Sequence, residues 1–541
     1  MCTNKFCLIA FALLTLWTAQ SQAQTTSIPT FNWFHFSKDL AIGQPDPNGE
    51  TIGGTEVMWI VVHKGKLFSA TSYWNNTSLH GPQMLVKETY NTAWKVDHTF
   101  PQNVVRNDAL NSFVFTTNRY GNPLPQPDTL LVASCMTQPF GTDRNIRVFT
   151  RNDQDNTWVP SSNIDTILNV NDSYIRSFTF HKDTVTEIEY VFAGGSNGKL
   201  YKGSYDASLP NKIFWDTTPE IQLFSGERFH SGAVCNGRLY VAGGTNNSYP
   251  NEGGLYLRID GINPTWKRVY TWPGSSHPGM RSLTAVPNPV NINSDVLIGT
   301  REYDGVIERI VPMPGDTVNV VLEMDVRQSF TNTWGGLGGL IAIAAYNRLD
   351  EGFNPVTGEK VWFLGLNIKH PNPLGTPEAN NAYTLMRDAA GNYAYCMVVD
   401  SSILIPPGVG LKSVRTMQIS PFPQDSNRVY YLGGFDGANG PHQYSDLRYR
   451  AEVIPGLSVG VGEPTSAVFF RVYPNPVENQ LRVAPSGRAF AYEAYDPFGR
   501  RVLYGRSEGY SVDFSILPAG IYLLRISYDQ RQIQTFKIIK K

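Results

Sequence analysis

A strand-like phrase that ends on a small residue recurs seven times between residues 31 and 453. Each phrase is a run of aliphatic, β-branched or aromatic residues that closes on Gly, Ser or Thr, as in "YVFAGG" and "LYVAGG". The closing residues are Thr71, Ser134, Gly194, Gly243, Gly299, Gly365 and Gly433, at intervals of 63, 60, 49, 56, 66 and 68 residues. A strand-rich period of this size, without helical periodicity, predicts an all-β chain built as a seven-bladed β-propeller.

The packing of blades explains the phrase. A four-stranded unit cannot bury both of its faces alone, so neighbouring blades must stack. Gly at the closing position allows either a positive φ or a close approach of two backbones. Trp94, Trp158 and Trp266 stand where outer strands are expected, and we expect them to pack between blades. The segment "FNWFHF" (residues 31–36) is expected to complete the last blade and close the ring.

One unit carries a more specific pattern. Residues 227–266 begin "ERFHSGAVCNGRLYVAGG", contain the pair Gly243-Gly244, and continue to Tyr256 and Trp266. This unit resembles a kelch repeat, and the unit around Gly194 is a looser copy. We therefore expect a kelch-like β-propeller over residues 24–453. Kelch propellers include interaction platforms and oxidases, so the resemblance implies the fold and leaves the function open.

Residues 1–23 have the pattern of a signal peptide. Lys5 is followed by an apolar stretch (residues 6–17) and by small residues before Gln24. We expect no transmembrane segment after cleavage, because no later stretch is long and apolar enough. The mature chain keeps Cys135, Cys235 and Cys396, which we expect to be buried thiols, since three scattered cysteines form no disulfide framework.

The carboxyl-terminal residues form a separate unit. A linker rich in Gly, Pro and Ser (residues 454–468) precedes residues 469–541, where alternating apolar positions and turn residues predict a small immunoglobulin-like β-sandwich. This unit resembles the carboxy-terminal (type A) sorting domain of type IX secretion cargo in Bacteroidetes. The matching residues are Tyr473, Pro474, Asn475 and Pro476 of "YPNP", Gly499 of "DPFGRRV", Gly520 of "LPAGIYLLRI", and the basic end.

The resemblance implies how the protein travels. The signal peptide would bring the chain to the periplasm, and the type IX secretion machinery would carry it across the outer membrane. The expected location is therefore outside the cell or on its outer surface. The alternative is a generic immunoglobulin-like accessory module.

Asp-Thr pairs followed by an apolar residue or Thr recur along the chain. They resemble the O-glycosylation signal of exported Bacteroidetes proteins, which makes their threonines candidate sites of modification. These are Thr129, Thr166, Thr184, Thr217 and Thr317. The alternative is structural, because Asp-Thr is also common at turns that enter strands.

Several predicted inner strands begin with a cation. These residues are Arg176, Arg228, His230, Arg281 and Arg415. If the positions are equivalent, the side chains meet near one mouth of the central channel, where guanidinium groups would bind a carboxylate, sulfate or phosphate. Trp334, on another inner strand, is a candidate platform for stacking a sugar. The alternative is structural pairing with nearby acids. Those acids are Glu56, Asp108, Glu302 and Asp304.

No sequence motif assigns a catalytic residue, a cofactor or a metal. The histidines show no metal-ligand spacing, and acidic and basic residues nearly cancel (46 against 45), without the clustered basic run that nucleic acid requires. The first functional hypothesis is an exported or cell-surface protein that recognises an extracellular glycan, peptide or protein. The second is a secreted enzyme that acts on a polysaccharide or another anionic polymer at the channel mouth. Propeller catalytic residues come from separate blades, so a missing linear motif does not exclude the enzyme.

Overall fold

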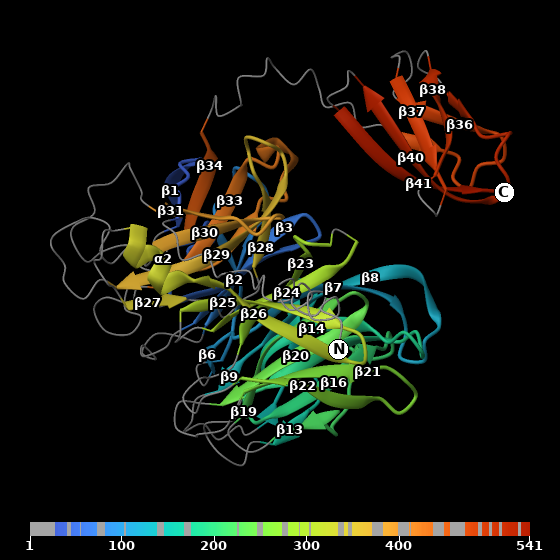
Figure 1. Ribbon diagram of the computed structural model, residues 1–541. Helices are drawn as coiled ribbons and strands as arrows, with labels where there is room; N and C mark the ends of the chain where they lie inside the picture. The colour runs from blue at the N-terminus through green and yellow to red at the C-terminus, as the bar shows by residue number, and fades with distance from the viewer. Residues whose placement is uncertain are drawn as a thin grey trace, which may run out of the picture. The chain divides into compact units, whose positions relative to one another are not determined.

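The computed structural model describes most of the chain from Ile28 onward. The described residues are 28–40, 45–54, 56–72, 82–101, 104–137, 145–166, 175–223, 227–245, 253–272, 280–291, 293–301, 305–333, 340–343, 349–369, 382–398, 411, 413–435, 448–454, 471–484, 490–496, 500–507, 511–528 and 532–541. The chain divides into two compact units, Met1–Leu457 and Ser458–Lys541. Both consist of small antiparallel sheets (Figure 1). Within the described residues, no helix has the length and apolar character needed to cross a membrane.

The first unit is a series of meanders, in which strands that follow one another in sequence are hydrogen-bonded neighbours. The first two runs are β2 (Glu56–His63), β3 (Lys66–Ser72), β4 (Gln83–Lys87) and β5 (Lys95–Thr99), then β7 (Leu110–Thr117), β8 (Pro123–Ser134), β11 (Val148–Asn152) and β12 (Thr157–Pro160). Next come β14 (Ile175–Lys182), β15 (Glu189–Gly195), β16 (Lys199–Tyr205) and β17 (Ile213–Trp215), then β19 (Glu227–Cys235), β20 (Arg238–Thr245), β21 (Gly254–Ile259) and β22 (Thr265–Thr271).

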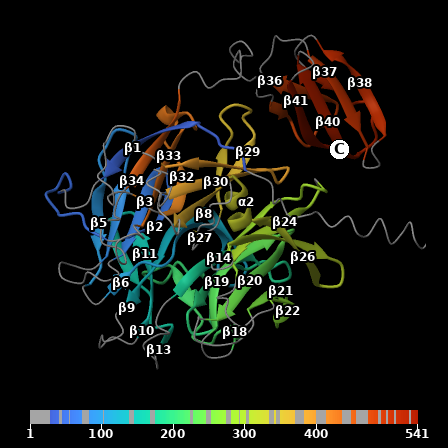
Figure 2. The same ribbon diagram turned by 60° about the vertical axis from the view of Figure 1, so that its left-hand side comes forward.

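The remaining meanders lie further along the chain (Figure 2). They are β23 (Arg281–Pro287), β24 (Asp295–Arg301), β25 (Val306–Met313) and β26 (Thr317–Asp325), then β27 (Leu340–Ile343), β28 (Asp350–Phe353), β29 (Lys360–Lys369), β30 (Ala382–Asp388) and β31 (Tyr393–Met397), then β32 (Ser413–Ile419), β33 (Val429–Phe435) and β34 (Arg448–Val453). Short elements between them are β6 (Val104–Arg106), β9 (Met136–Thr137), β10 (Asn145–Ile146), β13 (Asp165–Thr166), β18 (Ile221–Gln222), the helix α2 (Val326–Thr333) and the 3₁₀ turn η1 (Pro423–Asp425).

The amino-terminal strand β1 (Phe34–Leu40) pairs with β34, the last strand of the first unit. The register runs from Phe34 opposite Val453 to Leu40 opposite Arg448, and the two strands lie side by side in Figures 1 and 2. The amino-terminal segment therefore adds an edge strand to the meander of β32, β33 and β34, as expected. A single pair, Glu56 opposite Phe435, joins this meander to β2–β5 in one ten-stranded sheet.

Two closing glycines of the repeated phrase lie where neighbouring sheets approach closely. A Cβ on Gly365 of β29 would overlap the backbone carbonyl of Val414 in β32, and one on Gly194 of β15 would meet Phe229 of β19 at 2.7 Å. Neither glycine has a positive φ. Close backbone approach, and not a left-handed conformation, is therefore the reason for glycine at these positions.

A repeated polar contact joins neighbouring sheets. A carboxylate at the outer edge of one sheet accepts hydrogen bonds from a cation on the third strand of the next sheet and from an aromatic side chain at its fourth strand. Such sets in the described part of the chain are Asp39 with Lys87 and Trp94, Asp97 with Arg151 and Trp158, Glu220 with Arg258 and Trp266, and Glu323 with Arg387 and Tyr393. The three tryptophans expected between blades thus contact the neighbouring sheet.

Apolar cores fill the spaces between sheets. One core joins Phe68 of β3 to Leu131 of β8, and another joins Leu255 of β21 to Leu297 of β24. Since each fully buried side chain of this size contributes about 1.5–3 kcal/mol, the contacts between sheets stabilise the first unit strongly.

The second unit has two sheets around one core. The three-stranded sheet contains β35 (Arg471–Tyr473), β36 (Gln480–Ala484) and β39 (Ser511–Asp513), and the four-stranded sheet has the order β38 (Arg501–Ser507), β37 (Phe490–Tyr495), β40 (Gly520–Tyr528) and β41 (Gln532–Lys540). Leu481 and Val512 of the first sheet share this core with Leu524 and Ile538 of the second.

The edge of β41 is covered near its end. The Asn475 amide donates to the Lys537 carbonyl at 2.7 Å, and the Ile539 N–H donates to the Asn475 side-chain oxygen at 2.9 Å. Val477 adds a backbone bond to the Ile539 carbonyl at 2.8 Å. The motif "YPNP" therefore pairs with polar groups that an open strand edge would leave exposed.

Candidate functional site

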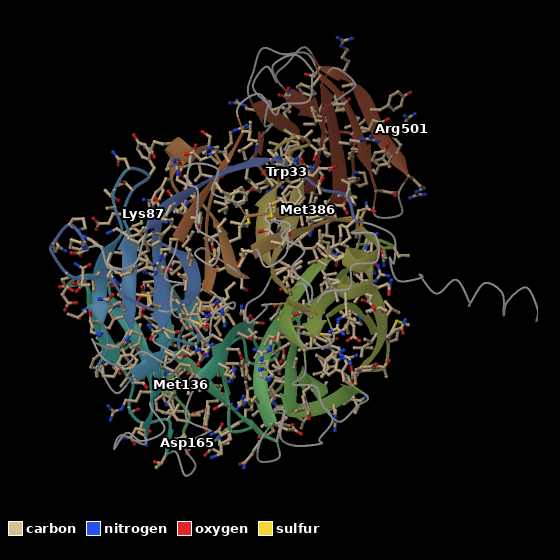
Figure 3. The ribbon with its side chains drawn as sticks, turned by 90° about the vertical axis from the view of Figure 1, so that its left-hand side faces the viewer. Trp33, Lys87, Met136, Asp165, Met386 and Arg501 are labelled. Carbon is tan, nitrogen blue, oxygen red and sulfur yellow. The ribbon has the colours of Figure 1, made fainter. Side chains whose placement is uncertain are left out.

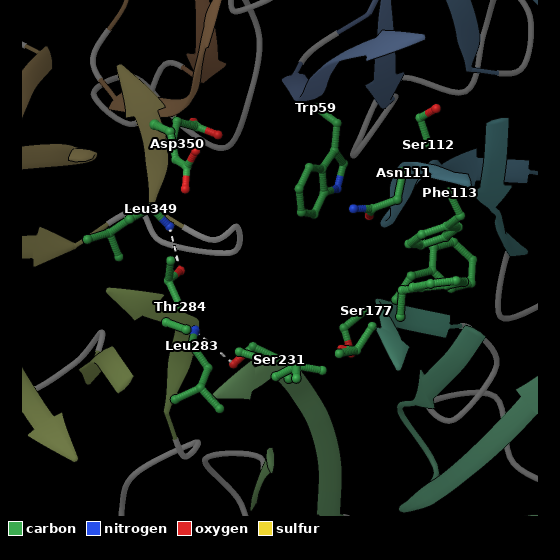
Figure 4. A pocket seen from close by; sticks show the side chains of 18 of the residues that line it. Trp59, Asn111, Ser112, Phe113, Ser177, Ser231, Leu283, Thr284, Leu349 and Asp350 are labelled. Carbon is green, nitrogen blue, oxygen red and sulfur yellow. Dashed lines mark hydrogen bonds between the residues drawn. The ribbon is translucent and has the colours of Figure 1, made fainter. Parts of the chain in front are cut away.

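The first strands of the sheets in the first unit enclose a cavity of about 650 Å³ (Figure 4). Its lining residues come from β2, β7, β14, β19, β23, β28 and β32, with Leu349 directly before β28. The Leu349 N–H donates to Thr284 Oγ1 at 3.0 Å, which ties β28 to β23. Sheets far apart in sequence thus contribute to one site.

One wall of the cavity is aromatic. Trp59, Phe113, Phe178 and Phe180 line it, and Phe113 and Phe180 stack with ring centroids 5.7 Å apart. Trp59 Nε1 donates to the Asp108 carbonyl at 2.7 Å, which fixes the orientation of the indole. Rings held in this way offer flat faces to an apolar or sugar-like ligand.

Polar groups line the rest of the cavity. Ser177, Ser231 and Thr284 use their hydroxyls to bridge neighbouring first strands; Ser177, for example, donates to the Phe229 carbonyl at 3.2 Å. The Asn111 amide has no hydrogen-bond partner among the described residues and extends into the cavity beside Trp59 (Figure 4). Asn111 is therefore the polar side chain best placed to meet a ligand.

Three of the predicted cations lie at β-bulges in the first strands of their sheets. The pairing of the first strand shifts register around Arg176 in β14, around His230 in β19 and around Arg415 in β32. A bulge of this kind re-aims the side chain of the extra residue. The register shift thus falls at Arg176, His230 and Arg415 in three different sheets.

Three of the predicted arginines act electrostatically on the predicted histidine. His230 is 4% exposed, borders the cavity, and has no partner for Nε2 among the described residues. Burial lowers the pKa of His230 well below its ordinary value, and the nearby charges of Arg281, Arg176 and Arg228 lower it further. The imidazole is consequently neutral at neutral pH, next to a cluster of guanidinium groups.

Arg415 belongs to a different cluster. It forms an ion pair with the fully buried Glu56, to which Arg106 also lies close at 3.8 Å. Arg106 pairs in turn with Asp108 at 2.9 Å. For Arg415 the structure therefore shows the acidic pairing that the sequence offered as an alternative. Glu302, Asp304 and Trp334 lie outside the described residues.

Sequence reasoning missed the cavity wall itself. Trp59 sits in "EVMWIVVH" and Phe113 in "LNSFVFTT", where both look like ordinary core residues of an apolar strand. No local pattern sets them apart, because whether they face a core or the cavity depends on how β2 and β7 are placed among the other first strands.

The candidate glycosylation sites differ in exposure. Thr166, Thr184, Thr217 and Thr317 are exposed, whereas Thr129 is half-buried. The aspartates before them make contacts of their own, such as Asp165 with Lys199 and Asp183 with Arg258, both at 2.6 Å. Gly499 of the sorting motif lies outside the described residues, and Gly520 begins β40.

The cysteines are buried and unpaired, as expected. Cys135, Cys235 and Cys396 are free thiols. Burial raises the pKa of Cys235 to about 12, so this thiol stays protonated. No group of His, Cys, Asp and Glu side chains in the described part of the chain is arranged to hold a metal.

The carboxyl-terminal unit matches a known family. Residues 471–541 fit the family described as the secretion system C-terminal sorting domain. The chain ends in a sorting domain for type IX secretion. The protein is therefore exported to the cell surface or to the outside, where the type IX machinery delivers it. This match favours the sorting role over a generic accessory module.

Solved structures resemble the chain only distantly. PorZ, a surface component of the type IX secretion system of Porphyromonas gingivalis, is 13% identical with a TM-score of 0.42, and the alignment covers 91% of this chain and 61% of PorZ. The periplasmic gluconolactonase PpgL of Pseudomonas aeruginosa is 13% identical with a TM-score of 0.42, covering 85% and 98%. A candidate 6-phosphogluconolactonase of Bacteroides fragilis is 10% identical with a TM-score of 0.37, covering 71% and 94%. A comparison with curated proteins gives no match.

Proposed function

We propose that this protein is an exported recognition protein that binds an extracellular acidic carbohydrate in the cavity of its first unit. The observation that carries the proposal is the composition of the cavity. It combines a fixed aromatic wall at Trp59, a free amide at Asn111, and a buried imidazole at His230 whose pKa the charges of nearby arginines lower. Aromatic faces stack on sugar rings, amides bind hydroxyls, and guanidinium groups bind carboxylates.

The fold proposed for this role is a kelch-like propeller with seven blades, preceded by a signal peptide and followed by an immunoglobulin-like sorting domain. Two observations support the propeller. The cavity is lined by one strand from each meander, and β1 completes the sheet of β34. Such a ring brings the first strands of all its blades to a common axis.

The alternative is a secreted enzyme that acts on a polysaccharide or another anionic polymer. Asp350 also lines the cavity, so that a carboxylate and a neutral imidazole border the same space. Asp350 accepts a hydrogen bond from the Met417 N–H at 2.6 Å. A carboxylate and an imidazole at one cavity are groups that can act as general acid and base.

The deciding experiment measures binding of the full mature chain to a panel of acidic and neutral glycans. We expect saturable binding of an acidic glycan, weakened about tenfold, or about 1.4 kcal/mol, by Trp59→Ala or Asn111→Ala. Arg281→Ala should weaken the acidic ligand and spare its neutral analogue. Trp266→Ala, at the outer strand, is the matched control and should have no effect. Binding that all three cavity variants leave unchanged would refute the proposal.

Product analysis on the same samples separates binding from catalysis. New reducing ends or unsaturated products would identify an enzyme. In that case Asp350→Asn should abolish turnover while binding persists. Binding without products supports the recognition protein.

We also propose that the exposed threonines Thr166, Thr184, Thr217 and Thr317 carry O-linked glycans. Their exposure supports this assignment, because a modifying enzyme must reach the hydroxyl. Mass spectrometry of the secreted protein tests it peptide by peptide. Unmodified peptides at all of these positions would leave the Asp-Thr pairs with a structural role only.

A further inference from the structure

The two outward faces of the sorting domain differ in chemistry. On the three-stranded sheet, the strand positions between buried residues carry Gln480, Arg482, Ser511 and Asp513, which are all polar. On the four-stranded sheet, the alternation of buried and exposed residues along β40 instead places Ile521 and Leu523 outward. An apolar outward face is unusual for a soluble sandwich, because such faces are normally polar.

Register brings the outward apolar residues together. Ile521 of β40 lies opposite Ile539 of β41, and Leu523 lies opposite Tyr495 of β37. The aliphatic side chains of Ile521, Leu523 and Ile539 are 48%, 50% and 42% exposed. Tyr504 of β38, on the same face, is 68% exposed. Ile521, Leu523 and Ile539 form an apolar stripe on this face, and Tyr504 lies apart from it, opposite Glu493.

Cations border this stripe. Arg525 and Lys537 flank it on β40 and β41, and Arg501 and Arg506 stand at the β38 edge, where Figure 3 labels Arg501. Glu493 is the one carboxylate among the described residues of this face, and it forms an ion pair with Arg501 at 2.9 Å. The face therefore combines an apolar centre with a net positive rim.

We propose that this face, with Ile521, Leu523 and Ile539 at its centre and Arg525 and Lys537 at its rim, docks the sorting domain onto a component of the type IX machinery. The partner surface is apolar at its centre and carries carboxylates around it, because that arrangement complements both the stripe and its rim. The sorting role requires that the machinery recognise this domain, and the apolar stripe is the one described outward face suited to a protein contact.

The test is export of the full chain in a strain with type IX secretion. The stripe variant Ile521→Thr/Leu523→Thr/Ile539→Thr keeps residues that favour strands. It is expected to lower the extracellular protein about tenfold, with accumulation in the periplasm, since it removes apolar area from the centre of the contact, where the surface is fully buried. A strain without type IX secretion sets the fully retained level. The matched control is Ile516→Thr, which changes an isoleucine that is 72% exposed and lies outside the sheets.

Charge reversal gives a second, independent arm. Arg525→Glu/Lys537→Glu should also impair export, whereas Arg482→Glu on the opposite sheet should not. Thermal unfolding of the purified variants must match the wild type, which separates lost docking from lost folding. Normal export of both the stripe and the charge variants would overturn the proposal. So would wild-type self-association that the stripe variant abolishes, because the face would then join two copies of this chain.

Discussion

Arg258 of β21 donates to Glu220 at 2.6 Å, and this contact joins two neighbouring sheets. The arginine side chain is 1% exposed and also pairs with Asp183 and Asp260. Trp266 donates to the same Glu220 oxygen at 3.1 Å. A single buried guanidinium thus balances several carboxylates at the boundary between sheets.

Removing this guanidinium should destabilise the protein severely. Arg258→Ala is expected to lower the free energy of unfolding by about 3–5 kcal/mol, because it removes the counter-charge of the buried Asp183 and one of the partners of Glu220. Arg238→Ala is the matched control: Arg238 pairs with Asp316 at the surface, and its loss should cost about 0–1 kcal/mol. Chemical denaturation of both variants measures the difference. Equal losses would show that burial of the Arg258 pairs has no special importance.

Close approach at Gly365 leads to a second prediction. Gly365→Ala places a methyl group on the Val414 carbonyl, so the two sheets must separate; we expect a loss of about 3 kcal/mol or more, or failure to fold. Gly358 has a positive φ of 73° and open space around it. Gly358→Ala should therefore lower the free energy of unfolding by about 1 kcal/mol. Yields and thermal melts of the two variants provide the comparison. A milder effect at Gly365 than at Gly358 would contradict the assignment.

The lowered pKa of His230 predicts a pH dependence. In the unfolded chain this histidine binds a proton below its ordinary value of 6.5, whereas in the folded protein it stays neutral. Protonation therefore favours the unfolded state, so His230 reduces stability as the pH falls below 6.5, by up to about 1.4 kcal/mol per pH unit. His230→Gln should flatten the stability curve between pH 6.5 and 5. Parallel curves for variant and wild type would show that His230 is protonated in the folded state.

Removal of the carboxyl-terminal unit should abolish export. A chain that ends before Glu463 is expected to remain in the periplasm, because it lacks the domain that directs it across the outer membrane. Immunoblots of periplasm and culture medium measure the distribution. The reciprocal construction, residues 454–541 fused behind a signal peptide and a reporter, should reach the medium. Undiminished extracellular protein after the deletion would exclude the sorting role.

The repeated phrase was enough to predict an all-β chain and the role of its closing glycines. Gly194 and Gly365 lie on second strands that pass close to the next sheet. A larger side chain would not fit there, so the glycine in the sequence marks the close approach. The motif "YPNP" was likewise visible, because its residues are consecutive in the chain.

The cavity could not be predicted in the same way. Whether Trp59 faces a core or a channel depends on the position of β2 among the other first strands, which no local pattern records. Arg415 and Glu56 are far apart in sequence. From the sequence alone, Arg415 could pair either with a bound anion or with a carboxylate of the protein. Only the placement of the strands shows that it pairs with Glu56. The electrostatic effect of Arg176, Arg228 and Arg281 on His230 likewise depends on how their strands are placed, which the sequence does not record.

The position of β41 has a consequence for protein synthesis. Ile538 of β41 is fully buried, and β41 is the edge strand that closes the four-stranded sheet. The sorting domain therefore cannot assemble its core before β41 has been translated. A polypeptide that terminates before β41 lacks the folded sorting domain, and we expect it to stay inside the cell.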